Sequence, residues 1–509
     1  MNAAALPNPL IPGFNPDPSC VRVGDEYIAV TSTFEYLPAL PVYRSTDLVT
    51  WEHVGDVAAD DDRVGLAGCA SGTGTWAPTI RHHDGRFYVI VSIAGSPRGC
   101  VVFTAADPAG PWDAGVSIDG VDGIDPDVAW DHDGTAYVTW SGLHLSGPLA
   151  GTHDGIVQAR ADLVGGRLLE EPRRLWSGTG LTAPEAPHLY HRDGTWYLVI
   201  AEGGTGRGHA VSVARGDRIT GPFTGAPANP VLTAAGSDRP VVCTGHADLV
   251  TAPDGTDVIL LLGTRPVDGA GSYSVLGRET FVTPVDWVDG WPVPQPVRLA
   301  PREEPVEELF PLSGDDPFAG AGWLGVRRPP SAVAHASGPD GVVLRGTGLG
   351  LREDQPVFAG RRQRHIECTV SVVVEALGGE GGIALRFHEE ATITLLVAGS
   401  PGGLGTVTAR ADIASIAQTA AVEVPAGPVA LEIATRRPRP AWTPWAQGAD
   451  EITLSAVDAA GRRHELMRLD GRYWAVETAA PFTGRVLGVL AQDGDVLLRD
   501  FRYHGAGGS

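Results

Sequence analysis

Three acidic residues, far apart in the chain, each stand beside prolines at the start of a strand-like run. They are Asp17, Asp125 and Glu185, in segments 15–19, 123–127 and 183–188. Proline fixes its own φ and restrains the residue before it, so each carboxyl can be held in a stiff segment. Three preset carboxyls are the groups that acid–base hydrolysis of a sugar linkage uses. For any one of them alone, the alternative is that the side chain only caps a turn.

A repeated pattern gives these acids a common frame. A Gly/Asp turn followed by an aromatic or β-branched run occurs five times, and its aspartates are Asp25, Asp84, Asp133, Asp193 and Asp254, which are 59, 49, 60 and 61 residues apart. Asp-Gly between alternating runs predicts a β-hairpin, and a further short strand follows most copies. Repeats of this length without a helix pattern predict a propeller of five blades. A solenoid is the rival interpretation, but its repeats are usually shorter and its strands parallel.

The acids occupy matching points in this frame. Each of the three precedes the aspartate of its own repeat by eight residues, and the same offset in the second and fifth copies falls on a tryptophan and a histidine. In a propeller the innermost strand of each blade lines the central channel, so equivalent positions lie around one axis. The frame therefore predicts one ring that faces a common funnel and consists of Asp17, Trp76, Asp125, Glu185 and His246.

The two members of the ring that are not acids each have two interpretations. Trp76 either packs in the core or forms a platform against the face of a sugar. His246 is either a hydrogen-bonded channel histidine or holds a water or metal ion at the axis. A single histidine without neighbouring ligands is a weak metal signal, so the sequence predicts no metal site.

Composition excludes several classes of function. The chain has 509 residues, which predicts two domains. Its net charge of −23 argues against nucleic acid and against anionic membrane as partners. There is no lysine, so all 38 basic residues are arginine and Schiff-base chemistry is excluded. The five cysteines are scattered without a CxxC pair, which predicts free and mostly buried thiols.

The expected location is the cytoplasm. Residues 1–12 lack the basic and apolar regions of a signal peptide, and no run of about 18 apolar residues predicts a membrane span. A hydrolase at this location acts on small, imported substrates. The sequence does not determine the oligomeric state and is compatible with a homo-oligomer.

The repeat ends around residues 300–315, where segment 300–305 is predicted to be an exposed linker. Alternating strand patterns then return at 366–375, 382–387, 392–397, 429–434 and 485–490. Gly-rich turns between these patterns favour a β-sandwich. The predicted fold is thus all-β, with a five-bladed β-propeller over residues 6–303 and a β-sandwich over residues 315–505.

Taken together, these motifs resemble glycoside hydrolase family 43. The resemblance is closest to the β-xylosidase branch, which carries a C-terminal β-sandwich of the concanavalin A-like type. The matching segments are residues 8–19, 31–35, 76–79, 185–189, 202–205, 245–247, 277–280 and 360–365. They cover nearly the whole chain, and the resemblance implies a five-bladed propeller and an inverting mechanism.

The resemblance also implies a role for each acid. Asp17 is the general base that activates water, and Glu185 is the general acid that protonates the leaving oxygen. Asp125 orients the acid and raises its pKa by like charge. Inversion needs base and acid about 6.5–9.5 Å apart. The side chains implied to line the sugar subsite are Phe34, Trp76, Thr205, His246 and Arg278, with Phe482 as the candidate aromatic by which the sandwich domain closes the pocket.

The chain departs from the family pattern at two places. The family usually has glycine after the general acid, where this chain has Ala186. Segment 64–75 also differs from the expected insertions. Both departures bear on the subsites for the leaving group more than on the chemistry.

The sequence therefore predicts exo-hydrolysis of a terminal β-D-xylose from a small oligosaccharide. An α-L-arabinofuranosidase, or a bifunctional enzyme, is the alternative, because the ring hydroxyls of the two sugars can be superposed in one subsite. The sandwich domain, which tends to close one side of the pocket, favours the β-xylosidase over an endo-acting arabinanase.

Two alternatives come from other classes. A non-catalytic sugar-binding propeller could lose an acid, but all three are present. A metal-dependent propeller enzyme needs a cluster of His or Asp around the axis, and only His246 is evident. The expected reaction requires no cofactor, although the resemblance allows a structural calcium ion near His246, bound through waters as in some relatives.

Overall fold

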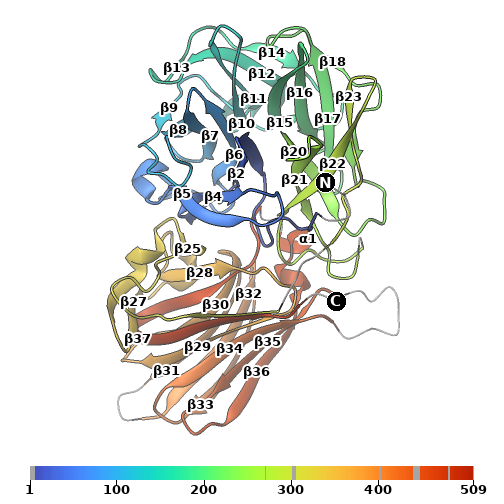
Figure 1. The fold of residues 1–509 in the computed structure, drawn as a ribbon. Coiled ribbons are helices and arrows are strands. Elements are labelled where there is room, and N and C mark those ends of the chain that lie inside the picture. The colour runs from blue at the N-terminus through green and yellow to red at the C-terminus, as the bar shows by residue number, and fades with distance from the viewer. Residues whose placement is uncertain are drawn as a thin grey trace.

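The computed structural model describes residues 6–269, 271–300, 305–399, 403–438, 448–479 and 482–507. These residues form two β-rich domains that pack against each other, the propeller above and the sandwich below in Figure 1. The predicted linker falls largely on residues 301–304, outside the described residues. Within the described ranges, no helix is long and apolar enough to cross a membrane.

Five antiparallel sheets make up the propeller, as the repeat predicted. The first blade contains β1 (Ser19–Val23), β2 (Glu26–Val30), β4 (Ala39–Ser45) and β5 (Glu52–Ala58). The second contains β6 (Gly74–His83), β7 (Arg86–Ala94), β8 (Gly99–Ala105) and β9 (Val116–Ser117). The third contains β10 (Ile124–Trp130), β11 (Ala136–Leu143), β12 (His153–Asp162), β13 (Arg167–Leu168) and β14 (Arg173–Trp176).

The last two blades follow the same plan. The fourth contains β15 (Glu185–Arg192), β16 (Thr195–Glu202), β17 (Ala210–Gly216), β18 (Thr224–Gly225) and β19 (Leu232–Thr233). The fifth contains β20 (Val242–Thr251), β21 (Asp257–Thr264), β22 (Glu279–Val288) and β23 (Trp291–Pro294). The first strands of the five blades, β1, β6, β10, β15 and β20, contact their neighbours around the axis. Short 3₁₀ turns lie at η2 (Asp61–Arg63) and η3 (Gly147–Leu149).

The segment before β1 joins the first blade to the fifth. Asn8 and Ile11 form isolated bridges with Ala300 and Thr280. The Asn8 side chain donates to the Val282 carbonyl in β22 at 2.8 Å. These bonds close the ring of blades between its two ends.

The sandwich domain contains fourteen of the strands. Its elements are β24 (Val306–Phe310), β25 (Trp323–Val326), η4 (Pro330–Val333), β26 (Ala334–Gly338), β27 (Gly341–Thr347), η5 (Gly350–Arg352), β28 (Phe358–Arg362), β29 (Cys368–Ala376), β30 (Glu380–His388), β31 (Ala391–Gly399), β32 (Gly405–Ile413), β33 (Ile416–Val424), β34 (Val429–Arg436), β35 (Glu451–Val457), β36 (Arg463–Asp470), η6 (Gly471–Trp474), α1 (Val476–Ala479) and β37 (Val486–Gly505).

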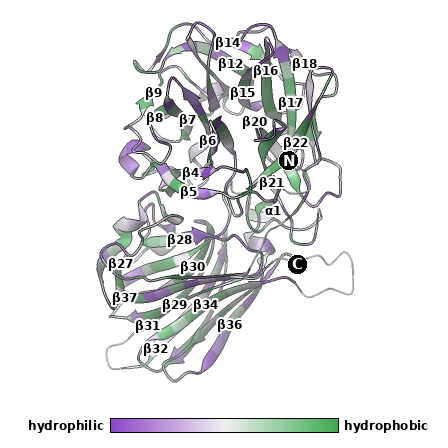
Figure 2. Ribbon diagram, in the orientation of Figure 1, coloured by the Kyte–Doolittle hydropathy of each residue, from purple (hydrophilic) through white to green (hydrophobic). Residues whose placement is uncertain are grey.

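The strand β37, which is 20 residues long, takes part in both layers of the sandwich. Its first half pairs with β28 and β30, and its second half pairs with β24, β27 and β29. Alternating strand residues fill the core between the layers, including Phe387, Leu431 and Phe501. Figure 2 shows hydrophobic residues concentrated on the strands of both domains. All five cysteines are free and buried, which confirms the prediction from their spacing.

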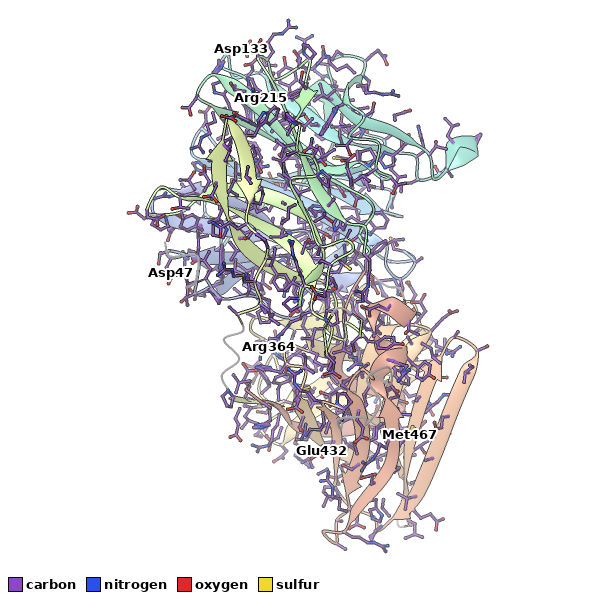
Figure 3. The ribbon with its side chains drawn as sticks, turned by 90° about the vertical axis from the view of Figure 1, so that its right-hand side faces the viewer. Asp47, Asp133, Arg215, Arg364, Glu432 and Met467 are labelled. Atoms are coloured by element: carbon purple, nitrogen blue, oxygen red, sulfur yellow. The ribbon has the colours of Figure 1, made fainter. Side chains whose placement is uncertain are left out.

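Backbone pairing joins the two domains. The short strand β3 (Tyr36–Leu37), from the first blade, pairs with β25 of the sandwich. Arg364 lies at the junction in Figure 3, where its carbonyl accepts a hydrogen bond from Arg265 of the propeller at 3.3 Å. The sandwich is therefore attached next to the segment that carries Phe34.

Candidate active site

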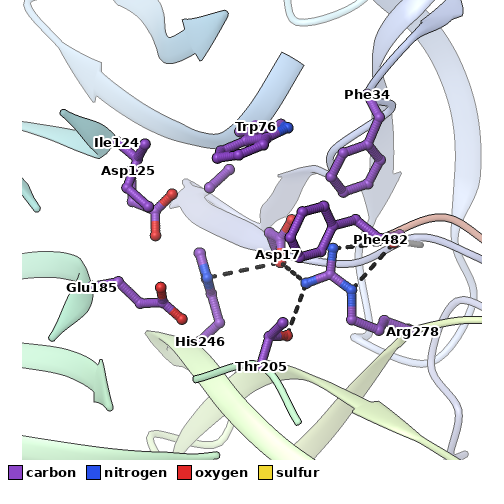
Figure 4. A pocket seen from close by; sticks show the side chains of 11 residues that line it. Asp17, Phe34, Trp76, Ile124, Asp125, Glu185, Thr205, His246, Arg278 and Phe482 are labelled. Atoms are coloured by element: carbon purple, nitrogen blue, oxygen red, sulfur yellow. Dashed lines mark hydrogen bonds and ion pairs between the residues drawn. The ribbon is translucent and has the colours of Figure 1, made fainter. Parts of the chain in front are cut away.

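One pocket, at the end of the propeller axis that faces the sandwich, holds every residue that the sequence placed in the site. It encloses about 400 Å³, counted together with its open mouth. Figure 4 shows the side chains converging on this space. The lining residues are Asp17, Phe34, Trp76, Ala77, Ile124, Asp125, Glu185, Thr205, His246, Arg278 and Phe482. Of these, only Ala77 and Ile124 were not predicted.

Irregularities in the innermost strands aim these side chains. The register of β6, β10, β15 and β20 shifts at the pocket. The backbone adopts positive φ at Asp17 (55°), Asp125 (54°) and His246 (52°), and at Ala77 (43°) and Ala186 (51°) in the second and fourth blades. Non-glycine residues adopt this left-handed conformation at a cost of about 1–2 kcal/mol, and bulges of this kind redirect side chains next to active sites. Trp76 and Glu185 thus precede the left-handed residue of their blade, whereas the other three ring members occupy it.

Asp17 is the carboxyl with a positive partner. Arg278 Nη1 lies 3.1 Å from Asp17 Oδ1, and the Ser32 hydroxyl donates to Oδ2 at 2.6 Å. His246 Nδ1 is 3.7 Å from Oδ1. Burial raises the pKa of Asp17, but Arg278, His246 and Ser32 together outweigh it and hold the pKa below its usual value. Asp17 is therefore ionised at neutral pH and can accept a proton.

Glu185 is shifted in the opposite direction. Burial raises its pKa to about 7, the charge of Asp17 adds to the rise, and Arg278 opposes it. Burial, then Glu185 and Asp17, raise the pKa of Asp125 well above its usual value. Asp17 acts as a like charge on both carboxyls, and the repulsion between Glu185 and Asp125 is mutual. A buried carboxyl with a pKa near 7 is protonated in a large fraction of molecules at neutral pH and can donate a proton.

Asp125 contacts the segment that carries Glu185 through the backbone. Its Oδ2 accepts a hydrogen bond from the Ala186 N–H at 3.1 Å. Ala186 directly follows Glu185, so this bond fixes the start of β15 relative to β10. Asp125 thus orients the predicted acid by holding its main chain.

A buried histidine that sequence reasoning missed lies beside Glu185. His209 Nε2 is 3.8 Å from Glu185 Oε1, and Nδ1 is 3.1 Å from the Cys243 carbonyl, to which it donates. Burial lowers the pKa of His209 to about 4, so the ring is neutral and Nε2 carries a lone pair. A Cβ at Gly245 would meet the His209 ring at 2.5 Å, so glycine is required there. His209 stands outside the offset that defined the ring, so the repeat did not mark it.

Aromatic side chains from both domains form the walls. Phe482 stacks on Phe34 with ring centroids 5.9 Å apart and meets Trp76 edge-on at 5.4 Å. The Phe482 carbonyl accepts from Arg278 Nε and Nη2 at 3.2 and 3.1 Å, while Nη1 also donates to Thr205 at 3.0 Å. The sandwich domain therefore contributes a wall and also helps to aim the arginine that lies against Asp17.

A second group of polar residues, the axial cluster, lies two to five residues further along the innermost strands. It consists of Arg81, Asp127, His188, Tyr190 and Asp248. Arg81 is 3.0 Å from Asp127 Oδ1 and 2.9 Å from Asp248 Oδ2, and it donates to His188 Nδ1 at 2.9 Å. Tyr190 donates to Asp248. Each of the two acids lies two residues after a ring member, but the bulge between them breaks the strand period, so that period did not predict their place.

His246 offers no direct ligand set for an ion. Burial lowers its pKa to about 3, so its ring is neutral. In the ranges that the structure describes, no group of three or more His, Cys, Asp or Glu side chains is placed to hold a metal ion. An ion near His246 fits only if water supplies most of its ligands.

A propeller pocket that holds one ionised carboxyl and two carboxyls with raised pKa values fits the site of a glycoside hydrolase. The chain belongs to glycosyl hydrolases family 43, whose model matches residues 6–292. The model of the β-xylosidase C-terminal concanavalin A-like domain matches residues 315–497. Both matches agree with the fold and with the resemblance that the motifs carried.

Several relatives are similar over most of their length. A non-reducing-end α-L-arabinofuranosidase of Bacteroides ovatus is 37% identical over 84% of this chain and 82% of its own. A solved structure from the xyloglucan utilisation locus of the same organism has a TM-score of 0.84 and 33% identity, covering 98% of this chain and 99% of that one. The xylan β-1,4-xylosidase structure from Bacillus halodurans has a TM-score of 0.84 and 25% identity over 98% and 99% of the two chains.

Proposed function

We propose that this protein is an inverting exo-glycosidase that removes terminal β-D-xylose from xylo-oligosaccharides. The observation that carries the proposal is the opposite pKa shift of two carboxyls that face each other's charge in one pocket. The pKa of Asp17 is lower than usual, and the pKa of Glu185 is raised to about 7. A base that is ionised and an acid that is protonated at the same pH are what single-displacement hydrolysis requires.

The reaction follows from these protonation states. Asp17 takes a proton from a water molecule as the water oxygen attacks the anomeric carbon. The bond from that carbon to the glycosidic oxygen breaks, and Glu185 gives its proton to the leaving oxygen. The sugar is released with inverted anomeric configuration, with Asp17 protonated and Glu185 ionised, and proton exchange with solvent restores both.

The walls support removal of a single terminal sugar. Phe34, Trp76 and Phe482 offer apolar faces for the ring, and Arg278 and Thr205 offer polar groups for its hydroxyls. Phe482 closes the pocket from the sandwich side, which suits an exo-acting enzyme better than one that needs an open groove.

An α-L-arabinofuranosidase is the second candidate. It is favoured by the 37% identical relative of that name, which matches this chain over most of both lengths. The pocket chemistry is the same for either sugar, so the difference lies in how the walls fit a furanose or a pyranose ring.

Nitrophenol release from aryl β-D-xyloside and aryl α-L-arabinofuranoside, with wild type and Glu185→Gln in parallel, tests both candidates. Loss of xyloside turnover in the variant supports the proposal, and turnover of the arabinofuranoside alone selects the second candidate. The loss is expected to be larger on xylobiose than on the aryl xyloside, since nitrophenolate needs less help from an acid. A general acid contributes about 10²–10⁴-fold. Turnover of neither substrate contradicts both candidates.

The pH profile of kcat/KM supplies an independent check. Activity requires Asp17 ionised and Glu185 protonated, so the rate is expected to fall above about pH 7 as Glu185 loses its proton. On the acid side the rate falls only below the usual range of an aspartate, because the pKa of Asp17 is lowered. A basic limb near pH 9, or one unchanged in Glu185→Gln, contradicts the assignment of the acid.

We also propose that any calcium ion near His246 is structural. If so, a chelator leaves kcat unchanged and at most lowers the unfolding temperature. A loss of turnover that added calcium restores contradicts a purely structural role.

A further inference from the structure

Arg386, from β30 of the sandwich domain, is completely buried against the propeller. Its side chain and that of Glu35 both have 0% exposure, and Nη1 lies 3.0 Å from Glu35 Oε1. The same nitrogen donates to the Tyr36 hydroxyl at 2.6 Å, and Nη2 donates to Ser71 Oγ at 3.0 Å. These three partners belong to propeller segments that border the pocket, and Glu389 of the sandwich itself lies 3.7 Å from Nη2.

The contacts of Arg386 continue to the aromatic walls. Glu35 directly follows Phe34, and its second oxygen, Oε2, accepts a hydrogen bond from the Gly72 N–H at 3.1 Å. The Gly72 carbonyl in turn accepts from Trp76 Nε1 at 2.8 Å. The Arg386 guanidinium is therefore connected to Trp76 through Glu35 and Gly72. It is connected to Phe34 through Glu35, the next residue in the chain.

The residue next to Arg386 holds the third wall. The Phe387 carbonyl accepts a hydrogen bond from Thr483 Oγ1 at 3.0 Å, and the Thr483 side chain is buried. Thr483 follows Phe482, whose ring faces Phe34 and Trp76. One end of β30 thus contacts the supports of all three aromatic side chains.

Resting on the proposed function, we propose that Arg386 is a positioning residue for the sugar pocket. It holds Phe34 and Trp76 in place through Glu35, Ser71 and Gly72, and it does not touch the substrate. Burying an ion pair is costly because desolvation offsets much of the attraction, but its charge-assisted hydrogen bonds are directional and fix geometry. Ser71 lies in segment 64–75, where the chain departs from the family pattern, and this contact joins that segment to the sandwich.

The proposal separates sugar binding from bond breaking. The three acids are held by the innermost propeller strands, by Arg278 and by Ser32, none of which bonds to Arg386. Loss of Arg386 therefore loosens the walls while the acids keep their protonation states. Binding weakens, and the chemical step is largely retained.

Kinetics of four variants test this inference below their unfolding temperatures. Arg386→Met removes every hydrogen bond of the guanidinium. Arg386→Lys keeps the positive charge but lacks the planar guanidinium group, and Ser71→Ala removes one hydrogen-bond partner of Arg386. Arg345→Met is the matched control, because Arg345 bonds Asp495 at 2.6 and 2.7 Å in the same domain on a half-exposed surface. The expected rise in KM for the aryl glycoside is about tenfold or more in Arg386→Met and about twofold to fivefold in Ser71→Ala, as for loss of binding common to ground and transition states. The kcat and the pH profile of Arg386→Met are expected to stay near those of wild type. The KM of Arg386→Lys is expected to lie between those of wild type and Arg386→Met, and the KM of Arg345→Met is expected to equal that of wild type.

Amide hydrogen exchange tests the same contact without substrate. In Arg386→Met or Arg386→Lys, the amides of residues 64–76 are expected to lose protection, Gly72 above all, while Arg345→Met keeps it. Unchanged KM and unchanged exchange in folded Arg386 variants overturn the inference, as does a fall in kcat alone. If Arg386→Met does not fold, the KM values and the amide exchange of Arg386→Lys and Ser71→Ala test the inference instead. If the wild type hydrolyses neither aryl glycoside, the proposed function fails, whereas the exchange result still judges Arg386.

Discussion

The ring of Asp17, Trp76, Asp125, Glu185 and His246 at the pocket, called here the pocket ring, lies next to the axial cluster on the innermost strands. The carboxyls of the two groups are paired with arginine in different ways. Among the three carboxyls of the pocket ring, Arg278 bonds Asp17, and the two others, Asp125 and Glu185, have raised pKa values. Asp125 is buried and only 16% of the Glu185 side chain is exposed, so water compensates little for the missing cation.

In the axial cluster, the cation is shared. Arg81 lies within 3.0 Å of both Asp127 and Asp248, and Tyr190 and Ser19 add hydrogen bonds to Asp248. Burial raises the pKa of Asp248, but Arg81 and the other partners lower it far more. Burial alone therefore does not make a carboxyl an acid catalyst. In this molecule, the pKa of a carboxyl is raised where the nearest arginine bonds a neighbouring carboxyl instead.

The largest expected effect comes from breaking the pocket ring. Asp17→Asn keeps the shape and one hydrogen-bond acceptor but cannot take a proton from water, so kcat is expected to fall by about 10²–10⁴-fold. Turnover of the aryl glycosides measures the loss, and circular dichroism checks that the fold persists. A variant that keeps a tenth of the wild-type rate contradicts the role of Asp17 as base.

Breaking the axial cluster is expected to cost stability instead. Arg81→Met leaves Asp127 and Asp248 buried without their cation, which lowers the free energy of unfolding by about 3–5 kcal/mol. Urea titration measures this loss, and turnover per folded molecule is expected to stay within a few-fold of wild type. Arg345→Met, on the surface of the sandwich, is the control and should change stability little. Full stability of Arg81→Met, or loss of turnover in the folded variant, shows that the two groups are not separable in this way.

The smallest effect concerns the residue after Glu185. Ala186 has φ 51°, so glycine there relieves about 1–2 kcal/mol of backbone strain. The greater freedom of glycine in the unfolded chain offsets about 0.4–1 kcal/mol, so Ala186→Gly is expected to stabilise the protein slightly. Thermal unfolding of Ala186→Gly is compared with Ala129→Gly, in the regular part of β10, which should destabilise it. Equal losses in both variants contradict the assignment of strain.

Much of this site could be predicted from the sequence because, in a propeller, residues at the same position of each repeat lie around one axis. The count of eight residues from each Asp-Gly turn led to the five ring members, all of which line the pocket. It did not show that Trp76 and Glu185 stand one residue before the bulge. In the second and fourth blades, two residues form the turn between the first two strands, whereas in the third and fifth blades five residues do. Counting back eight residues from the aspartate of the turn therefore reaches different points of the innermost strand.

Other parts of the site depend on contacts between distant segments and carried no local pattern. Phe482 was found only through the family resemblance, since it lies beyond the repeat. His209 and Arg386 are single buried residues whose partners are 34 and more than 300 positions away. Neither periodicity nor composition marks such residues, because their importance lies in which other side chain they meet.

The path of β37 has a consequence for synthesis on the ribosome. The blades and the three acids are complete once the chain has emerged to about residue 300, because Ala300 closes the ring with Asn8. The sandwich cannot assemble until Val486–Gly505 follows, since that strand pairs in both of its layers. Domains generally fold as units as they are made. A nascent molecule therefore acquires its acids first and its closed pocket last, so that chains halted before Phe482 carry the chemistry without the wall that confines it.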